Sequence, residues 1–227
     1  MVGLIIAGIL LVVAIGVGQW YAGERRRRQL EEWGRATGLT FSPEKAYGLD
    51  ERYPDLDCLR SGSNRYAYNT LAGDIKGRRC LAFDYHYETH TTNAKGQTQT
   101  QHHYFSALIL NSAVPLKPLL IRPEHFFDKV AEFFGADDID FESAEFSRKF
   151  FVKSPDRRWA YDVIHPRMME FLLASPGFHV EMDSLHVLVC RESLFSAADF
   201  TAAASLACGI LQRLPEYLVK QQATEPL

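Results

Sequence analysis

The sequence lacks the short motifs by which many enzyme classes are recognised. It contains no nucleophile elbow (G-x-S-x-G), no zinc-protease motif (H-E-x-x-H), no Walker A loop and no dinucleotide-binding G-x-G-x-x-G. Its four cysteines are scattered and form no C-x-x-C pair, which argues against a zinc ribbon or a thioredoxin-like redox motif. Because catalytic residues also assemble from distant strands, these absences lower the expectation of an enzyme without removing it. We predict a non-enzymatic protein that needs no cofactor.

The sequence also lacks the excess of basic residues that a nucleic-acid-binding surface needs. The chain of 227 residues carries a formal net charge of −3. Outside one block of four arginines, the other 21 Lys and Arg residues stand against 28 Asp and Glu residues. A surface that follows phosphates needs cations spread over a face, so nucleic acid is not an expected partner. With 47% apolar and 12% aromatic residues, the chain is expected to fold around one core.

One long apolar run stands at the start of the chain. Residues 2–17 are all apolar or glycine, and Trp20 and Tyr21 follow shortly after. As a helix, residues 2–21 would cover roughly 30 Å, the thickness of the hydrocarbon layer of a bilayer. No basic residue precedes the run, as one would in a cleaved signal peptide. The pattern predicts an uncleaved transmembrane anchor over residues 1–23, with Trp20 and Tyr21 at the membrane–water interface.

The block Arg25, Arg26, Arg27 and Arg28 follows the apolar run directly. Arginines beside a span stay on the cytoplasmic side, and they also attract anionic lipid at about 1 kcal/mol each. We therefore predict a single-pass protein of the plasma (inner) membrane, with its N-terminus outside and its C-terminal domain in the cytoplasm. The lipid bilayer is the first expected partner. In a reducing cytosol the four cysteines are expected to be free thiols.

The rest of the chain alternates strand and helix signals in an α+β order. We predict a basic juxtamembrane helix and linker over 24–64, a cytoplasmic domain over 65–220 and a polar tail over 221–227. The fold class is α+β, in which an N-terminal transmembrane helix precedes a mainly antiparallel sheet packed with two or three helices, including a long C-terminal helix. A pleckstrin-homology-like roll is a minor alternative. The expected strands are 39–41, 65–75, 78–89, 102–110, 119–121, 146–152, 179–182 and 185–190.

Three helices are expected in the domain, at 123–134, 166–173 and 197–220. Pro123 and Pro166 favour first-turn positions, because proline fixes the helical φ and needs no hydrogen-bond acceptor there. Ser196 followed by Asp199 resembles a capping box at the start of the last helix. Pro215 is expected to bend or end that helix.

A polar hairpin carries the densest set of ionisable side chains. Asp84, His86, Glu88 and His90 alternate along one strand and therefore share one face. A turn centred on residues 95–96 would place Glu88 opposite His103. Imidazole and carboxylate groups bind Zn²⁺ and similar divalent metals, so His86, Glu88, His90 and His103 form a candidate metal site. The alternative is a solvated face whose residues pair across the strands.

The stretch from Leu119 to Leu172 resembles an uncharacterised family of bacterial single-pass membrane proteins, a domain of unknown function. The resemblance rests on four short motifs: Ile121-Arg122-Pro123-Glu124, Phe134-Gly135, Asp138-Ile139-Asp140-Phe141 and Glu145-Phe146-Ser147-Arg148. Family members share an N-terminal anchor and a polar hairpin, so the similarity extends over about 22–211. The resemblance implies kinship, and no activity, cofactor or catalytic residue comes with it.

The charged residues of these motifs also have a structural interpretation. A salt bridge from Arg122 to Asp138, Asp140 or Glu145 would fix the 123–134 helix against a neighbouring strand. The residues concerned are Arg122, Glu124, Asp138, Asp140, Glu145 and Arg148.

The leading functional hypothesis is a membrane-tethered, non-enzymatic domain that binds or scaffolds a partner at the inner face of the plasma membrane. A tether raises the local concentration of the domain near partners that share the bilayer. One alternative is a metal sensor or metal-dependent enzyme that uses the hairpin face. Another is an assembly protein that self-associates through the hairpin or the C-terminal helix.

Overall fold

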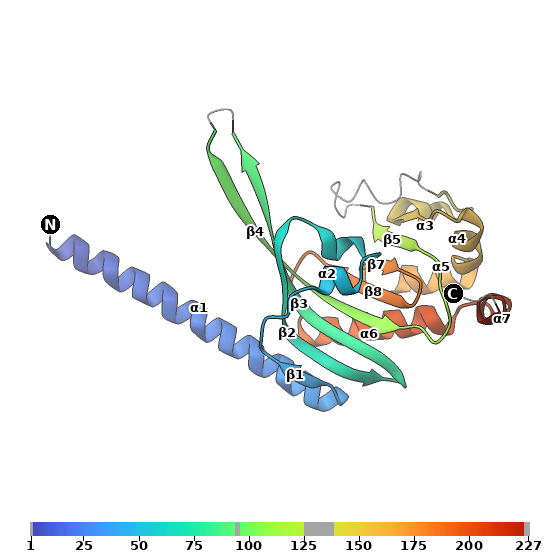
Figure 1. Cartoon of the computed structure of the whole chain (residues 1–227), viewed down its shortest axis with the longest axis horizontal. Coiled ribbons are helices and arrows are strands. Elements are labelled where there is room, and N and C mark those ends of the chain that lie inside the picture. The colour runs from blue at the N-terminus through green and yellow to red at the C-terminus, as the bar shows by residue number, and fades with distance from the viewer. Residues whose placement is uncertain (1, 94–95, 125–138, 225–227) are drawn as a thin grey trace.

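The computed structural model describes residues 2–93, 96–124 and 139–224, and its centre is one antiparallel sheet. Eight strands lie in the order β1-β2-β3-β4-β8-β7-β5-β6 (Figure 1). Every neighbouring pair is antiparallel, which confirms the expected α+β class with a mainly antiparallel sheet. The strands are β1 (Thr40–Ser42), β2 (Ser63–Ile75), β3 (Arg78–Thr92), β4 (Thr98–Asn111), β5 (Leu119–Pro123), β6 (Phe150–Lys153), β7 (His179–Met182) and β8 (His186–Arg191).

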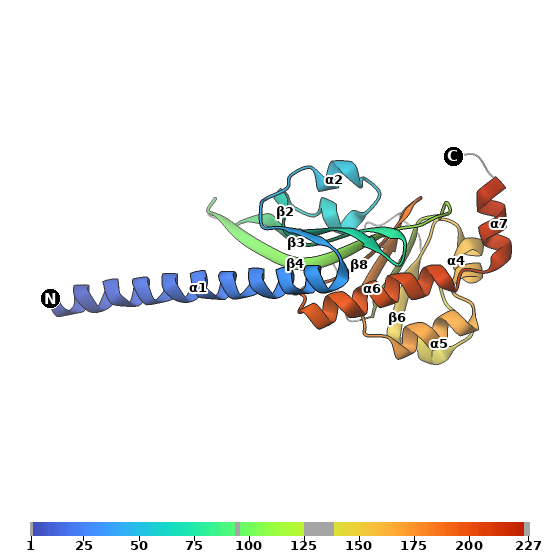
Figure 2. The same cartoon turned by 90° about the horizontal axis from the view of Figure 1, so that it is seen from below.

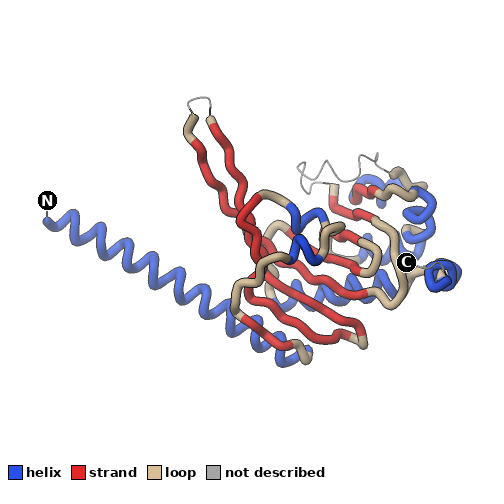
Figure 3. Tube along the Cα trace, in the orientation of Figure 1, coloured by secondary structure: helices blue, strands red, loops and turns tan. Residues whose placement is uncertain are grey.

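The helices lie at both ends of the chain, between β1 and β2, and between β5 and β7, as the tube view shows (Figure 3). They are α1 (Val2–Thr37), α2 (Leu49–Arg52), the 3-10 helix η1 (Asp57–Arg60), α3 (Ala144–Lys149), α4 (Arg157–Val163), α5 (Pro166–Ala174), α6 (Ala197–Gln212) and α7 (Glu216–Thr224).

Two hydrophobic cores lie on opposite faces of the sheet. Figure 2 shows α1 and α6 below the sheet and α2 above it. The larger core joins Leu30 and Trp33 of α1 to the sheet and to α5 and α6. The smaller core packs the α2–η1 segment on Phe83 and Tyr85. Segment 24–64, which we expected to be a juxtamembrane helix and linker, therefore contributes to both cores and supplies the edge strand β1.

Helix α1 runs without interruption from Val2 to Thr37 and projects far beyond the domain (Figures 1 and 2). Its C-terminal part is fixed to α6, because Trp33 stacks on Phe200 and its indole N–H donates to Thr201 Oγ1 at 2.9 Å. Among the residues placed well enough for description, no helix is long and apolar enough to cross a membrane. The anchor over residues 1–23 stays a prediction.

Helix boundaries follow the local capping signals. Ser196 and Asp199 form the expected capping box, each side chain accepting a backbone N–H of the other residue. Pro166 occupies the first turn of α5, as expected. The long C-terminal helix is divided around Pro215: α6 ends at Gln212 and α7 begins at Glu216.

Two predictions were wrong, one for residues 146–152 and one for Pro123. Residues 146–152 are not one strand: α3 ends at Lys149 and β6 begins at Phe150. Ser143 caps α3 by accepting the N–H of Phe146 at 3.3 Å, and this local bond outweighs the strand preference of the aromatic residues. Pro123 does not open a helix, since it ends β5 opposite Phe150. The remainder of the expected 123–134 helix, after Glu124, lies outside the described residues.

Candidate functional site

The β3–β4 hairpin pairs in a register that differs by one residue from our prediction. Glu88 lies opposite His102, and His103 lies opposite Tyr87. The hairpin is closed by the Asn93–Gln97 pair, and Gly96 adopts a positive φ of 75°. The pairing of Glu88 with His103 assumed a turn centred on residues 95–96, and the observed register is shifted from it by one residue. A shift of one residue moves a side chain to the other face of the sheet.

His103 is therefore the wrong ligand candidate. Its ring stacks on Tyr87 with centroids 4.6 Å apart, and its Nε2 lies 2.8 Å from Thr89 Oγ1. His90, another expected ligand, is also bonded elsewhere. Its ring nitrogens bond to Ser63 Oγ at 3.1 Å and to Thr100 Oγ1 at 3.0 Å.

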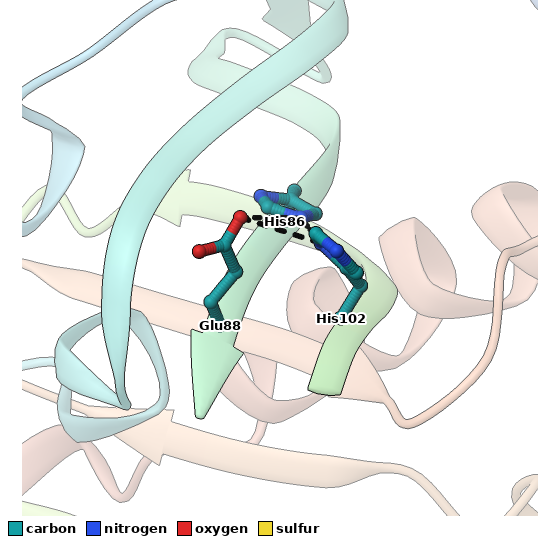
Figure 4. A group of neighbouring side chains, drawn as sticks. All are labelled: His86, Glu88 and His102. Carbon is teal, nitrogen blue, oxygen red and sulfur yellow. Dashed lines mark hydrogen bonds and ion pairs between the residues drawn. The ribbon is translucent and has the colours of Figure 1, made fainter. Parts of the chain in front are cut away.

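His86, Glu88 and His102 come together on the face that sequence alternation predicted for His86 and Glu88 (Figure 4). His86 Nε2 lies 3.1 Å from His102 Nδ1, and His102 Nδ1 lies 3.3 Å from Glu88 Oε1. The third separation, from His86 Nε2 to Glu88 Oε1, is 4.0 Å. Three potential ligand atoms therefore converge on one point between neighbouring strands.

Aromatic rings surround His86 and remove it from water. Its ring stacks on Tyr66 at a centroid distance of 4.5 Å and lies 4.9 Å from the ring of Tyr104. His86 is buried, Glu88 is half-buried and His102 is exposed. The cluster therefore has a dry side formed by tyrosines and an open side at His102.

Irregularities in β2 bring the supporting groups into position. Asn64 and Asn69 both take left-handed backbone conformations, each at a register shift between β2 and β3. Asn64 accepts from His86 Nδ1 through its backbone oxygen (3.1 Å) and donates from Nδ2 to Glu88 Oε1 (2.7 Å). Gly62 precedes this bend, where a Cβ atom would lie 2.2 Å from the Glu88 backbone oxygen. Only glycine permits this close approach of the two backbone segments.

Arg26 lies in a second polar cluster beside the first, where we had expected a contact with lipid headgroups. Its guanidinium donates to both carboxylate oxygens of the fully buried Asp84, at 2.7 and 2.5 Å, and to the backbone oxygen of Phe195 at 3.0 Å. Asp84 also accepts from Asn69 Nδ2 at 2.9 Å and from Ser106 Oγ at 2.6 Å. Arg26 thus joins α1 to the sheet. We had placed Arg26 at the membrane interface together with Trp20, Tyr21 and the other three arginines. That prediction was wrong for Arg26, because helix periodicity turns it inward.

The other members of that set lie on the surface of α1. Trp20 and Tyr21 are 70% and 65% exposed. Arg25, Arg27 and Arg28 are also exposed, and Arg28 pairs with Glu24 at 3.2 Å. These five positions remain available for contact with a bilayer.

The charged signature residues lie around α3 and β6. The Arg122 guanidinium stacks over the Phe151 ring at 4.3 Å, while Glu145 pairs with Lys149 at 3.0 Å. Glu124 donates its backbone N–H to Lys149, and Arg148 is exposed. The backbone oxygen of Asp140 accepts from Tyr161, and Asp138 lies outside the described residues. Among the described members, Arg122, Glu124 and Asp140 therefore make contacts between neighbouring segments of the chain.

The sequence analysis did not predict the buried pair of His179 and Glu181 on β7. His179 Nε2 lies 2.5 Å from Glu181 Oε1, and Glu181 also accepts the backbone N–H of Cys58 at the start of η1. Burial alone would lower the pKa of His179, whereas Cys190 and the hydrogen bond and charge of Glu181 raise it, to about 9. Alternation of His179 and Glu181 in the strand is the signal that could have found this pair.

Comparison with known proteins identifies a shared fold. No protein-family model matches the chain, and no curated protein matches it in sequence. A solved structure, the mycobacterial trehalose monomycolate transport factor A, superimposes with a TM-score of 0.63 at 15% sequence identity. The match covers 83% of this chain and 96% of that chain. At this identity the likeness establishes the fold alone. The family resemblance around residues 121–148 stays a prediction.

Proposed function

We propose that this chain is a membrane-tethered, non-enzymatic accessory domain that binds or scaffolds a partner at the inner face of the plasma membrane. The observation that carries the proposal is the division of α1 into two unlike parts. The C-terminal part packs into the domain core through Leu30 and Trp33. The N-terminal part exposes large apolar side chains, among them Leu10, Val13, Ile15 and Val17, each more than half exposed.

Such a surface is unfavourable in water and favourable in hydrocarbon. Burying apolar surface contributes about 25 cal/mol per Å², and monomeric soluble proteins rarely expose long apolar patches. The sequence of residues 2–21 is long enough to cross a bilayer, and it is followed at once by aromatic and basic residues. Arg25, Arg27 and Arg28 still provide the positive flank, because only Arg26 turns inward. These features support an orientation with the domain in the cytoplasm.

The fold likeness supports an accessory role. The protein that shares this fold is described as a transport factor for trehalose monomycolate. We infer that the present domain assists a membrane-bound process, through contact with a protein that shares the bilayer or through self-association. The likeness leaves the cargo and the partner open.

Tryptophan fluorescence provides a sharp test of the tether. The chain has three tryptophans, and Trp33 and Trp159 are buried in the domain core. In vesicles that contain brominated phospholipid, we expect part of the emission of the full chain to be quenched, because Trp20 lies at the level of the acyl chains and headgroups. The variant Trp20→Phe should lose this quenching.

Trp159→Phe is the matched control and should keep the quenching. Unchanged quenching in Trp20→Phe, or recovery of the protein free of vesicles, would contradict the tether. Protease added outside intact spheroplasts tests the orientation separately, and digestion of the domain there would contradict the cytoplasmic placement.

A further inference from the structure

We propose that His86, Glu88 and His102 form a binding site for Zn²⁺ or a similar divalent transition metal, at the base of the β3–β4 hairpin. This inference goes beyond the tether and does not rest on it. The site takes one ligand from each histidine, Nε2 of His86 and Nδ1 of His102, and one carboxylate oxygen from Glu88. Two imidazoles and one carboxylate are an established donor set for zinc with an open fourth position.

Two of the three separations are close to those that a tetrahedral zinc ion requires. Ligand atoms at zinc–nitrogen and zinc–oxygen bond lengths stand about 3.4 Å apart along the edges of a tetrahedron. Here two of the three separations are 3.1 and 3.3 Å, and the third is 4.0 Å. The longer edge runs to Glu88, whose carboxylate lies at the end of a flexible side chain. To shorten this edge, the Glu88 carboxylate would rotate toward His86.

Hydrogen bonding presents the correct nitrogen of His86. A backbone carbonyl only accepts hydrogen bonds, so the contact between His86 Nδ1 and the Asn64 oxygen requires a proton on Nδ1. The neutral ring then carries an unprotonated Nε2, whose lone pair points toward His102 and Glu88. Metal-binding histidines characteristically have such a backbone acceptor on the second nitrogen. The Asn64 side chain orients Glu88 in the same way, by donating to its Oε1.

The surroundings suit a metal that remains accessible. Tyr66 and Tyr104 pack against the His86 ring and exclude water from one side of the cluster. His102 is the exposed ligand, so solvent reaches the cluster from its side. Binding would connect β3 to β4 where the hairpin leaves the sheet (Figures 1 and 4). It would reach β2 through the hydrogen bonds of Asn64 to His86 and Glu88.

The alternative is a hydrogen-bonded cluster that binds no metal. In that arrangement the proton on His102 Nδ1 is shared between His86 Nε2 and Glu88 Oε1. A metal ion would replace this proton. The two states therefore differ in what the three residues bind, and a direct metal titration separates them.

The test uses the full chain in detergent, purified without a polyhistidine tag. Zn²⁺ is titrated in competition with a chromophoric chelator, and Co²⁺ is added to record the visible absorption typical of tetrahedral sites. We expect one Zn²⁺ per chain. His102→Ala should weaken binding by more than the roughly 10–100-fold that the loss of an outer-shell partner costs. Because His102 is exposed, this variant is expected to fold, and equal melting temperatures without metal check that it does.

Two variants serve as matched controls. His103→Ala removes the next imidazole along the strand, which lies on the opposite face, and His90→Ala removes the next one along the same face. Both should bind Zn²⁺ as the unmodified chain does, and Zn²⁺ should raise the melting temperature of these two variants but not that of His102→Ala. The proposal is overturned if no stoichiometric binding occurs, if His102→Ala binds normally, or if His103→Ala loses binding to the same degree.

Discussion

At the scale of single residues, one arginine of the basic block determines how α1 is held. Arg26 reaches a carboxylate that is completely buried, and Asn69, Ser106 and the Phe195 backbone complete its surroundings. Buried charges persist only when they are paired and hydrogen-bonded. The sequence gives the same prediction for all four arginines, because they all follow the apolar run. It does not indicate which of them points toward the sheet.

Arg26→Ala is expected to destabilise the domain by about 3–5 kcal/mol, because it leaves the Asp84 charge buried without its cation. Arg27→Ala is the matched control, since Arg27 is exposed one position along the same helix. It should change stability by no more than about 0.5 kcal/mol. Urea unfolding of both variants, followed by tryptophan fluorescence, measures the difference. Equal effects would show that the network does not hold α1.

The buried His179–Glu181 pair predicts a loss of stability in alkaline solution. The pKa of His179 is about 9 in the folded protein and about 6.5 when unfolded. The protonated ring therefore contributes stability that is complete below about pH 6.5 and is lost as the pH rises through about 9. Between these values the unfolding free energy should fall by up to about 1.4 kcal/mol per pH unit.

Stability curves at several pH values check this, together with an NMR titration of the His179 ring. The double variant His179→Gln with Glu181→Gln keeps polar side chains and removes both charges, so its stability should vary less over the same range. A His179 ring that titrates near pH 6.5 would contradict the prediction.

At the scale of elements, local signals predicted helix ends well and strand registers poorly. The Ser196 capping box, the Pro166 start and the break around Pro215 depend on neighbouring residues, and all three are present. The hairpin register depends on the length of a loop that the sequence does not specify uniquely. A one-residue difference there exchanged His103 for His102 in the candidate site. The aromatic residues at 146–152 favour a strand, but the Ser143 cap starts a helix that includes Phe146.

The packing of α5 against α6 depends on one glycine. A Cβ atom at Gly209 would lie 2.3 Å from Cζ of Phe171. The guanidinium of Arg213, the C-cap residue of α6, stacks on that ring 3.9 Å from its centroid, so a movement of the ring would disturb this contact. Gly209→Val should therefore lower stability by about 1–3 kcal/mol through overpacking.

Ser205→Val provides the control for helix propensity, since Ser205 is exposed on the same helix. Thermal unfolding of the two variants gives the comparison. If both lower the melting temperature equally, the contact with Phe171 does not limit the packing.

At the scale of the whole molecule, composition and the alternation of signals predicted the fold class, while the strand order remained out of reach. The sheet places β8 beside β4, although seventy-four residues separate Asn111 from His186, the pair at one end of this contact. Such long-range pairing depends on the joint packing of α1 and α6 on one face and the α2–η1 segment on the other. No local pattern carries that information. The shared fold of the transport factor shows that very different sequences adopt this fold.

The unbroken course of α1 has a mechanical consequence. A helix of 36 residues is about 54 Å long, and this one passes from its exposed end into the core without a joint. With its outer half inserted in lipid, the helix would turn the domain with it, because Arg26, Leu30 and Trp33 all hold its inner half to the sheet and to α6. Any change in tilt, such as one imposed by a thinner bilayer, would swing the protruding hairpin through an arc.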